Sequence, residues 1–152
     1  MKFLSPFRIA AALLVLFCAG HTLGGMLSQK SLGLASDAVF EAMKRVHFEF
    51  NGADSTWYGF WFGFGLTVSA FLLLSAAVAF QLDRVPSDQW HWVSPIAWAL
   101  VASHAANTFL AWKYFFAGPT LFGVLITVLL VAGSLRKSRS RQAGPAPLQS
   151  AR

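Results

Sequence analysis

Four long stretches of the chain contain no Asp, Glu, Lys or Arg, and they dominate its pattern of apolar and polar positions. These stretches are Ile9–Gln29, Ser55–Leu82, Gln89–Trp112 and Tyr114–Leu135. A helix needs about 20 mostly apolar residues to cross the hydrocarbon core of a bilayer. Backbone groups in lipid must be satisfied within the segment, so each stretch should be helical. The pattern therefore predicts four transmembrane helices, over residues 7–28, 56–82, 90–112 and 117–135.

The first stretch has to be compared with a signal peptide, because Lys2 and Arg8 precede the apolar run Ile9–Cys18. No clear cleavage site with small residues follows this run, and the apolar character continues to Leu27. We therefore interpret the segment as a retained helix, with a cleaved signal as the alternative.

The connection between the first two predicted spans, Lys30–Asp54, mixes four acids with three bases. Its apolar residues recur at helical spacing, which predicts a short amphipathic helix resting on the membrane surface. These residues are Val39, Phe40, Met43, Val46 and Phe50. Asn51-Gly52 then indicates a turn. An ordinary solvent-exposed loop is the alternative.

The segment after Leu135, residues 136–152, is basic, rich in Ser, Gly and Pro, and nearly free of large apolar residues. Such a composition cannot bury enough apolar surface to fold, so we expect a disordered tail. The expected fold class is all-α. An integral membrane four-helix bundle covers residues 1–135, with a short amphipathic outer-loop helix, and a disordered basic C-terminal tail covers residues 136–152.

The distribution of Lys and Arg predicts the orientation. With four spans, both termini and the Asp83–Gln89 loop share one side, which carries Lys2, Arg8, Arg84, Arg136, Lys137, Arg139, Arg141 and Arg152. The opposite side carries only Lys30, Lys44, Arg45 and Lys113. Since the side richer in Lys and Arg is cytoplasmic, we expect a multi-pass protein of the cell inner (plasma) membrane with cytoplasmic N and C termini.

The share of charged residues and the net charge indicate which classes of partner to expect. Hydrophobic residues make up 56% of the chain and charged residues 12%, whereas soluble domains carry about 25% charged residues. The net charge of +6 is concentrated at the chain ends, where it indicates topology and attraction to anionic membrane lipid rather than to nucleic acid. Cys18 is the single cysteine, so no disulfide can form within the chain. We expect no metal, no cofactor and no nucleic-acid partner.

Polar side chains inside two predicted spans form the main candidate site. His21 and Thr22 lie near the outer end of the first span, and His104 and Asn107 lie in the outer half of the third. Both helices run outward, so the two histidines should lie at comparable depth, where Glu49 or His47 of the outer loop can close over them. Two interpretations stay open: imidazoles that hold neighbouring helices together by hydrogen bonds, or a pocket for a ligand, proton or substrate.

Glycines at helical spacing predict where helices pack closely. Gly59, Gly63 and Gly65 lie near the start of the second span, and Gly24 and Gly25 offer a matching surface on the first. Two helices can approach closely where side chains are absent. We interpret these glycines as packing positions.

Three motifs carry a resemblance to a known family: HTLGG at 21–25, WYGFWFGFG at 57–65 and YFFAGP at 114–119. Through them the chain resembles an uncharacterised family of small bacterial four-helix membrane proteins, over Phe7–Leu135. In hydropathy and size it is also similar to DoxX-like membrane proteins. The resemblance implies a membrane location and brings no activity with it.

Three classes of function fit these observations. The first is a non-enzymatic protein that binds a lipophilic small molecule or a membrane partner, because the bundle is compact and poor in polar groups. The second is a membrane-embedded enzyme, an isomerase or a quinone-linked redox partner, with His21 and His104 as acid and base. The third is a small channel or transporter, which would have to be a homo-oligomer because the chain lacks room for inverted repeats.

Overall fold

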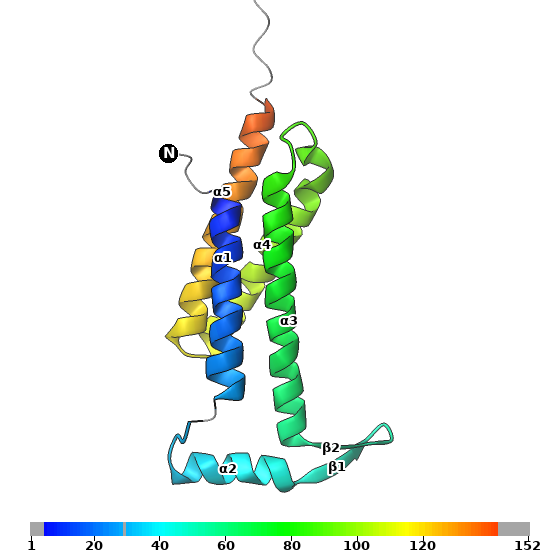
Figure 1. Ribbon diagram of the computed structural model, residues 1–152, viewed down its shortest axis with the longest axis vertical. Helices are drawn as coiled ribbons and strands as arrows, with labels where there is room; N and C mark the ends of the chain where they lie inside the picture. The colour runs from blue at the N-terminus through cyan, green and yellow to red at the C-terminus, as the bar shows by residue number, and fades with distance from the viewer. Residues whose placement is uncertain (1–4, 29, 143–152) are drawn as a thin grey trace, which may run out of the picture. The chain divides into compact units, whose positions relative to one another are not determined.

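The computed structural model in Figure 1 describes residues 5–28 and 30–142, and most of them are helical, as expected for an all-α fold. They form two compact units, one of residues 5–15 with 74–142 and one of residues 16–28 with 30–73. The elements in chain order are α1 (Pro6–Ala19), the π-helix η1 (Gly20–Leu27), α2 (Leu34–Arg45), β1 (His47–Phe50), β2 (Ala53–Thr56), α3 (Trp57–Arg84), α4 (Trp90–Tyr114) and α5 (Ala117–Gln142).

Three helices are long and apolar enough to cross a membrane: Pro6–Leu27, which joins α1 and η1, then α3 and α5. They coincide with the predicted spans at 7–28, 56–82 and 117–135. α4 is not among them, although its 25 residues exceed the length a span requires. Polar residues such as His91, His104 and Asn107 lower its mean hydropathy. The fourth span therefore stays a prediction.

In the first unit, α4 and α5 pack against each other along two buried stripes. The stripe of α4 recurs every seven residues and consists of Trp90, Ala97, His104 and Ala111. The stripe of α5 has the three- and four-residue spacing of one helix face and consists of Gly123, Ile126, Leu130, Gly133 and Ser134. A Cβ at Gly123 would lie 3.3 Å from the Cα of Thr108. The two backbones therefore approach closely because this position has no side chain.

Ser5 and Pro6 determine how α1 begins. Proline suits the first helical position, where its missing N–H has no intrahelical partner to lose. The Oγ of Ser5 accepts a hydrogen bond from the backbone N–H of Arg8 at 3.2 Å, which caps the first turn. The same hydroxyl donates to Oδ1 of Asp83, and Nε of Arg8 donates to Oδ2 of Asp83 at 2.6 Å. The Asp83 side chain is only 9% exposed, so it needs these donors.

Lys137 of α5 joins the same group of residues. Its Nζ donates to the carbonyl oxygens of Asp83 at 2.8 Å and Val85 at 2.7 Å. The last carbonyls of a helix have no partner within it, so this lysine satisfies the end of α3. Ser5, Arg8, Asp83 and Lys137, here named the Asp83 cluster, thus connect the start of α1 with the ends of α3 and α5.

Trp90 connects the start of α4 to the same end of the unit. Its side chain is 1% exposed, and its indole Nε1–H donates to Oγ of Ser138 at 3.1 Å. Its ring centroid lies 5.9 Å from that of Phe7. Four helix ends therefore meet at one end of the first unit.

In the second unit, α2 lies within the connection over residues 30–54, where the sequence predicts a helix. Figure 1 shows α2 lying crosswise to α3, with its C-terminal end near the point at which α3 begins. Phe40 of α2 packs edge-on against Trp61 of α3, with 5.4 Å between ring centroids. One apolar position of the predicted helix is therefore used in packing against α3.

β1 and β2 form an antiparallel hairpin that the sequence pattern does not predict. α2 ends at Arg45, Val46 after it has an extended backbone, and Phe50 lies in β1, so neither Val46 nor Phe50 is part of the predicted helix. Asn51 has φ of 52° and Gly52 has φ of 80°, and Asn-Gly is the pair favoured at the two left-handed positions of a tight hairpin turn. The predicted turn is confirmed, and it joins two short strands.

α5 continues to Gln142, whereas the predicted span ends at Leu135. The hydroxyls of Ser138 and Ser140 each donate at 3.0 Å to the carbonyl oxygen four residues earlier. Arg139 and Arg141 lie in the last turn, where positive charge interacts favourably with the helix dipole. Residues 136–142 of the predicted tail are thus helical, and residues 143–152 lie outside the described residues.

Gly123→Ala should destabilise the protein, whereas Gly63→Ala should be neutral or slightly stabilising. Alanine is the better helix former by about 1 kcal/mol, so the backbone gains in both variants. The new methyl group meets nothing within 4 Å at Gly63 but meets the side chain and backbone of Thr108 at Gly123, and such overpacking costs about 1–3 kcal/mol. Thermal unfolding in detergent, followed by circular dichroism, measures both variants. Equal melting temperatures would contradict the close approach of α4 and α5.

Candidate functional site

The first polar cluster lies in the second unit, where η1 faces α3 at Gly65. Nε2 of His21 lies 3.0 Å from the carbonyl oxygen of Gly65, and a Cβ at Gly65 would overlap the Sδ of Met26. His21 and Met26 are five residues apart, which places them on different faces of an α-helix. The i→i+5 bonding of a π-helix brings residues five apart nearly onto one face. The π-helix therefore lets both side chains contact Gly65.

Thr22 and Ser69 extend this cluster by one turn. Their hydroxyl oxygens lie 2.7 Å apart, and Oγ of Ser69 also donates to the Gly65 carbonyl oxygen at 3.4 Å. Sγ of the buried Cys18 donates weakly to the carbonyl oxygen of Ser69 at 3.4 Å. Each of these polar groups therefore has a partner on the facing helix.

The second cluster lies in the first unit around His104, which is 6% exposed. The carbonyl oxygen of His104 accepts a hydrogen bond from Oγ1 of Thr108 at 2.7 Å. Oγ1 of Thr108 also lies 3.4 Å from Oγ1 of Thr127 on α5. Within the described part of the chain, the imidazole itself makes no hydrogen bond, so its place in the buried stripe of α4 is determined by packing.

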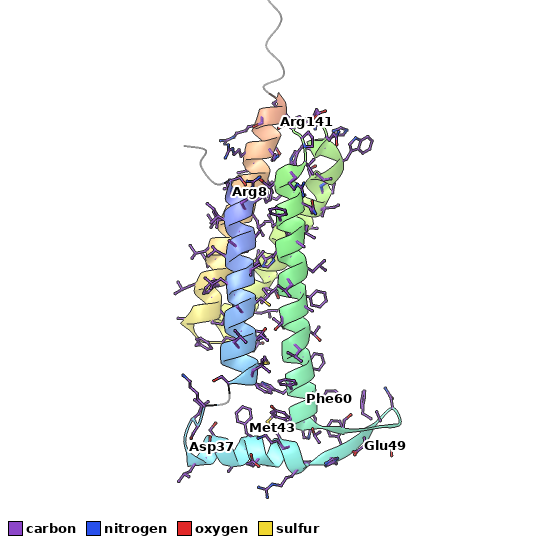
Figure 2. The ribbon with its side chains drawn as sticks, in the orientation of Figure 1. Arg8, Asp37, Met43, Glu49, Phe60 and Arg141 are labelled. Carbon is purple, nitrogen blue, oxygen red and sulfur yellow. The ribbon has the colours of Figure 1, made fainter. Side chains whose placement is uncertain are left out.

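The other predicted site residues are exposed. Asn107 lies on the exposed surface of α4, and its amide makes no hydrogen bond among residues 5–28 and 30–142. Glu49 is exposed on β1, directly opposite Asp54 of β2, and Figure 2 shows it at the hairpin. His21 belongs to the second unit and His104 to the first, so a pocket shared by the two histidines stays a prediction.

The hairpin also carries a contact between His47 and Asp54 that the sequence pattern does not predict. Nδ1 of His47 lies 3.0 Å from Oδ2 of Asp54, because the strand register places His47, Glu49 and Asp54 on one face. A cavity of about 430 Å³ adjoins the pair. The two side chains are 60% and 73% exposed, so water screens the pair and it contributes little to stability. Strands of four residues are too short for a clear alternating pattern.

The glycines predicted to pack helices differ in their surroundings. Gly65 lies against Met26, and a Cβ at Gly59 would lie 3.2 Å from Oγ1 of Thr56. A Cβ would meet nothing within 4 Å at Gly24 and Gly63, and only Nδ1 of His21, at 3.9 Å, at Gly25. Close approaches absent from the prediction occur at Gly123, which faces Thr108, and at Gly133, which faces Phe7.

No family model, curated protein or solved structure matches this chain. The resemblance to small bacterial four-helix membrane proteins and to DoxX-like proteins therefore stays an expectation, and the site has to be interpreted from its chemistry. Of the candidate residues, His21 and Thr22 contact the facing helix through polar atoms, and the described residues include no group of three or more His, Cys, Asp or Glu able to hold a metal ion. This arrangement suits helix association.

A double-mutant cycle tests whether the Thr22–Ser69 contact holds helices together. Thr22→Val keeps the shape and removes the hydroxyl, and Ser69→Ala removes its partner. We expect each variant to lower stability and the double variant to lose less than the sum, with a coupling of about 0.6 kcal/mol, the mean for such bonds in membrane proteins. Unfolding in mixed detergent micelles measures it. Strict additivity would contradict a direct bond.

Proposed function

We propose that α1, α3, α4 and α5 all cross the membrane, and that both termini lie in the cytoplasm of a cell whose inner membrane holds the protein. The support is geometric, because the Asp83 cluster brings the ends of α3 and α5 together. If α3 and α5 each span the bilayer, the chain leaves α3 on one side and must enter α5 on the other. α4 is the element between them, so it has to cross despite its lower hydropathy.

Charge supports the orientation. In Figure 2, Arg8 and Arg141 lie at the same end of the first unit. This end has two acids, Asp83 and Asp88, against a larger group of basic residues: Arg8, Arg84, Arg136, Lys137, Arg139 and Arg141. The connection over residues 30–54 has more acids than bases. The excess of Lys and Arg therefore favours the cytoplasm for the end with the Asp83 cluster.

Within this topology, the proposed function is non-enzymatic binding of a lipophilic small molecule or a membrane partner on α4. The observation that carries it is Asn107, an exposed amide in an apolar helix. Ser103, one turn earlier, is also exposed, with the small residues Ala99 and Ala106 beside it. An amide facing lipid is costly unless it finds a hydrogen-bond partner. A ligand with a polar group, or a helix of a partner such as a second copy, would supply one.

A membrane-embedded enzyme is the second candidate, and one observation favours it. His104 is buried, yet its imidazole makes no hydrogen bond in the described part of the chain. An imidazole without a structural partner is free to exchange a proton with a substrate. His21, which lies at hydrogen-bond distance from the Gly65 carbonyl, is less suited to that role. A small oligomeric channel or transporter is the third candidate, and no observation favours it.

Cysteine labelling tests the four crossings. In a Cys18→Ser background, Ser87→Cys and Phe116→Cys place single thiols on the two sides of α4. We expect a membrane-impermeant maleimide to label Phe116→Cys on intact spheroplasts and Ser87→Cys only after lysis. Asp54→Cys and Arg141→Cys serve as outside and inside controls. Labelling of Ser87→Cys and Phe116→Cys from the same side would contradict a membrane-spanning α4.

Asn107→Leu tests the binding face, because it keeps the approximate volume and removes the amide. We expect the variant to lose a co-purifying molecule or an oligomeric state that wild type shows in native mass spectrometry, while its melting temperature stays the same or rises. Phe109→Leu, on an exposed position of the same helix, is the matched control. Identical bound species and oligomeric state in wild type and Asn107→Leu would contradict a binding role for α4. Loss of bound species in His104→Gln alone would favour the enzyme.

A further inference from the structure

A second cavity, of about 200 Å³, lies beside the Asp83 cluster in the first unit. Its lining includes Ser5 and Phe7 from the start of α1, Ser87 from the turn before α4, and Arg136 and Lys137 from α5. The cavity therefore lies where four helix ends meet. None of the candidate residues on η1, β1 or α4 contributes to it.

Several hydrogen-bond donors that line this cavity have no acceptor among the described residues. Arg136 is exposed, and its guanidinium, with five N–H donors, makes no ion pair with any described residue. Lys137 donates two hydrogen bonds from its ammonium group to carbonyl oxygens at the end of α3. Its third N–H is therefore available to another acceptor. The Ser87 hydroxyl makes no hydrogen bond within the described ranges. The wall therefore offers spare donors from three side chains.

The carboxylate of Asp83 also lines the cavity, and alone it would repel an anion. It is compensated by Arg8, whose Nε lies 2.6 Å away, and by the hydroxyl of Ser5. Arg136 and Lys137 then give the lining an excess of positive charge. α1 begins here and α3 ends here, so the opposite ends of their helix dipoles offset each other and the positive charge of the cavity comes from its side chains. The cavity as a whole is suited to an anion.

We propose that this cavity binds a phosphate group, supplied by the headgroup of an anionic phospholipid or by a soluble phosphate. Its volume is below the roughly 300–1,000 Å³ of sites that enclose whole small molecules, so it fits a headgroup and not a complete lipid. Guanidinium groups match phosphate oxygens with two parallel hydrogen bonds. The cavity also lies at the ends of three membrane-length helices, where headgroups are. The inference needs only this placement and does not depend on ligand binding by α4.

Titration of the purified full-length chain with three probes tests the proposal. The probes are dioleoylphosphatidylglycerol, dioleoylphosphatidylcholine and inorganic phosphate, and binding is measured by native mass spectrometry and by the shift in melting temperature. Arg136→Gln removes the guanidinium group that is proposed to bind the phosphate. Arg139→Gln, three residues along the same helix and outside the cavity lining, is the control for net charge. Arg136→Lys keeps the charge without the paired donors.

We expect phosphatidylglycerol to bind wild type and Arg139→Gln alike, and Arg136→Gln about tenfold more weakly, the loss typical of one charge-assisted contact. Arg136→Lys should be intermediate, and phosphatidylcholine, whose phosphate is neutralised by its choline, should bind more weakly throughout. Inorganic phosphate that competes with the lipid and shows the same dependence on Arg136 would identify a soluble source. Equal weakening by Arg136→Gln and Arg139→Gln would overturn the proposal, because binding would then follow net charge alone.

Discussion

The hydrogen bonds around one carboxylate, that of Asp83, hold the ends of the helices in the first unit together. A carboxylate that is 9% exposed cannot be left without partners, because burying an uncompensated charge costs several kcal/mol, on the order of 3–5. Its donors come from α1, and Lys137 of α5 satisfies the carbonyl oxygens of the same turn. Ser5 has two roles, because its hydroxyl also caps α1. The start of α1 therefore depends on the Asp83 side chain, while the end of α5 is joined to the same turn of α3 through backbone carbonyl oxygens.

The sequence was sufficient for the helices because lipid imposes a one-dimensional rule. A segment that crosses a bilayer must be long and free of charge. The charge-free stretches from Arg8 to Lys30 and from Asp54 to Asp83 follow that rule directly. The turn at Asn51-Gly52 could also be predicted, because its conformation depends only on adjacent residues. The Asp83 cluster could not be predicted. Arg8 and Lys137 lie 75 and 54 residues from Asp83 in the sequence, and no local pattern relates them.

The candidate site was only partly predictable, for a similar reason. Glycine spacing identified Gly65, but whether a glycine matters depends on the residue that faces it, which is Met26 here and Thr108 at Gly123. The prediction assumed a regular α-helix around His21, whereas the π-helix rotates the residues that follow it. In the sequence, His21 and His104 both lie within predicted spans and at comparable predicted depth. In the structure, one lies at hydrogen-bond distance from a backbone carbonyl and the other is packed without such a partner.

Several polar groups in the long helices contribute to association between neighbours, as Thr22 does with Ser69 and Thr108 with Thr127. Asn107 and Arg136 differ, because each has strong donors and neither bonds another described residue. One lies along a predicted span and the other at the end where four helices meet. Binding at these two positions would therefore involve different chemistry, an amide in apolar surroundings and a cation near the headgroups.

The length of α3 has a consequence for the bilayer itself. Its 28 residues extend for about 42 Å at 1.5 Å per residue, while the hydrocarbon core is only about 30 Å thick. If α3 crosses the membrane, a helix this long has to tilt, or project into the polar layers, or thicken the membrane around it. Trp57 and Tyr58 at one end and Asp83 and Arg84 at the other are residues that tolerate the polar layers. If α3 crosses the membrane, its excess length can project into the polar layers at both ends, and the helix should accommodate bilayers of different acyl-chain length.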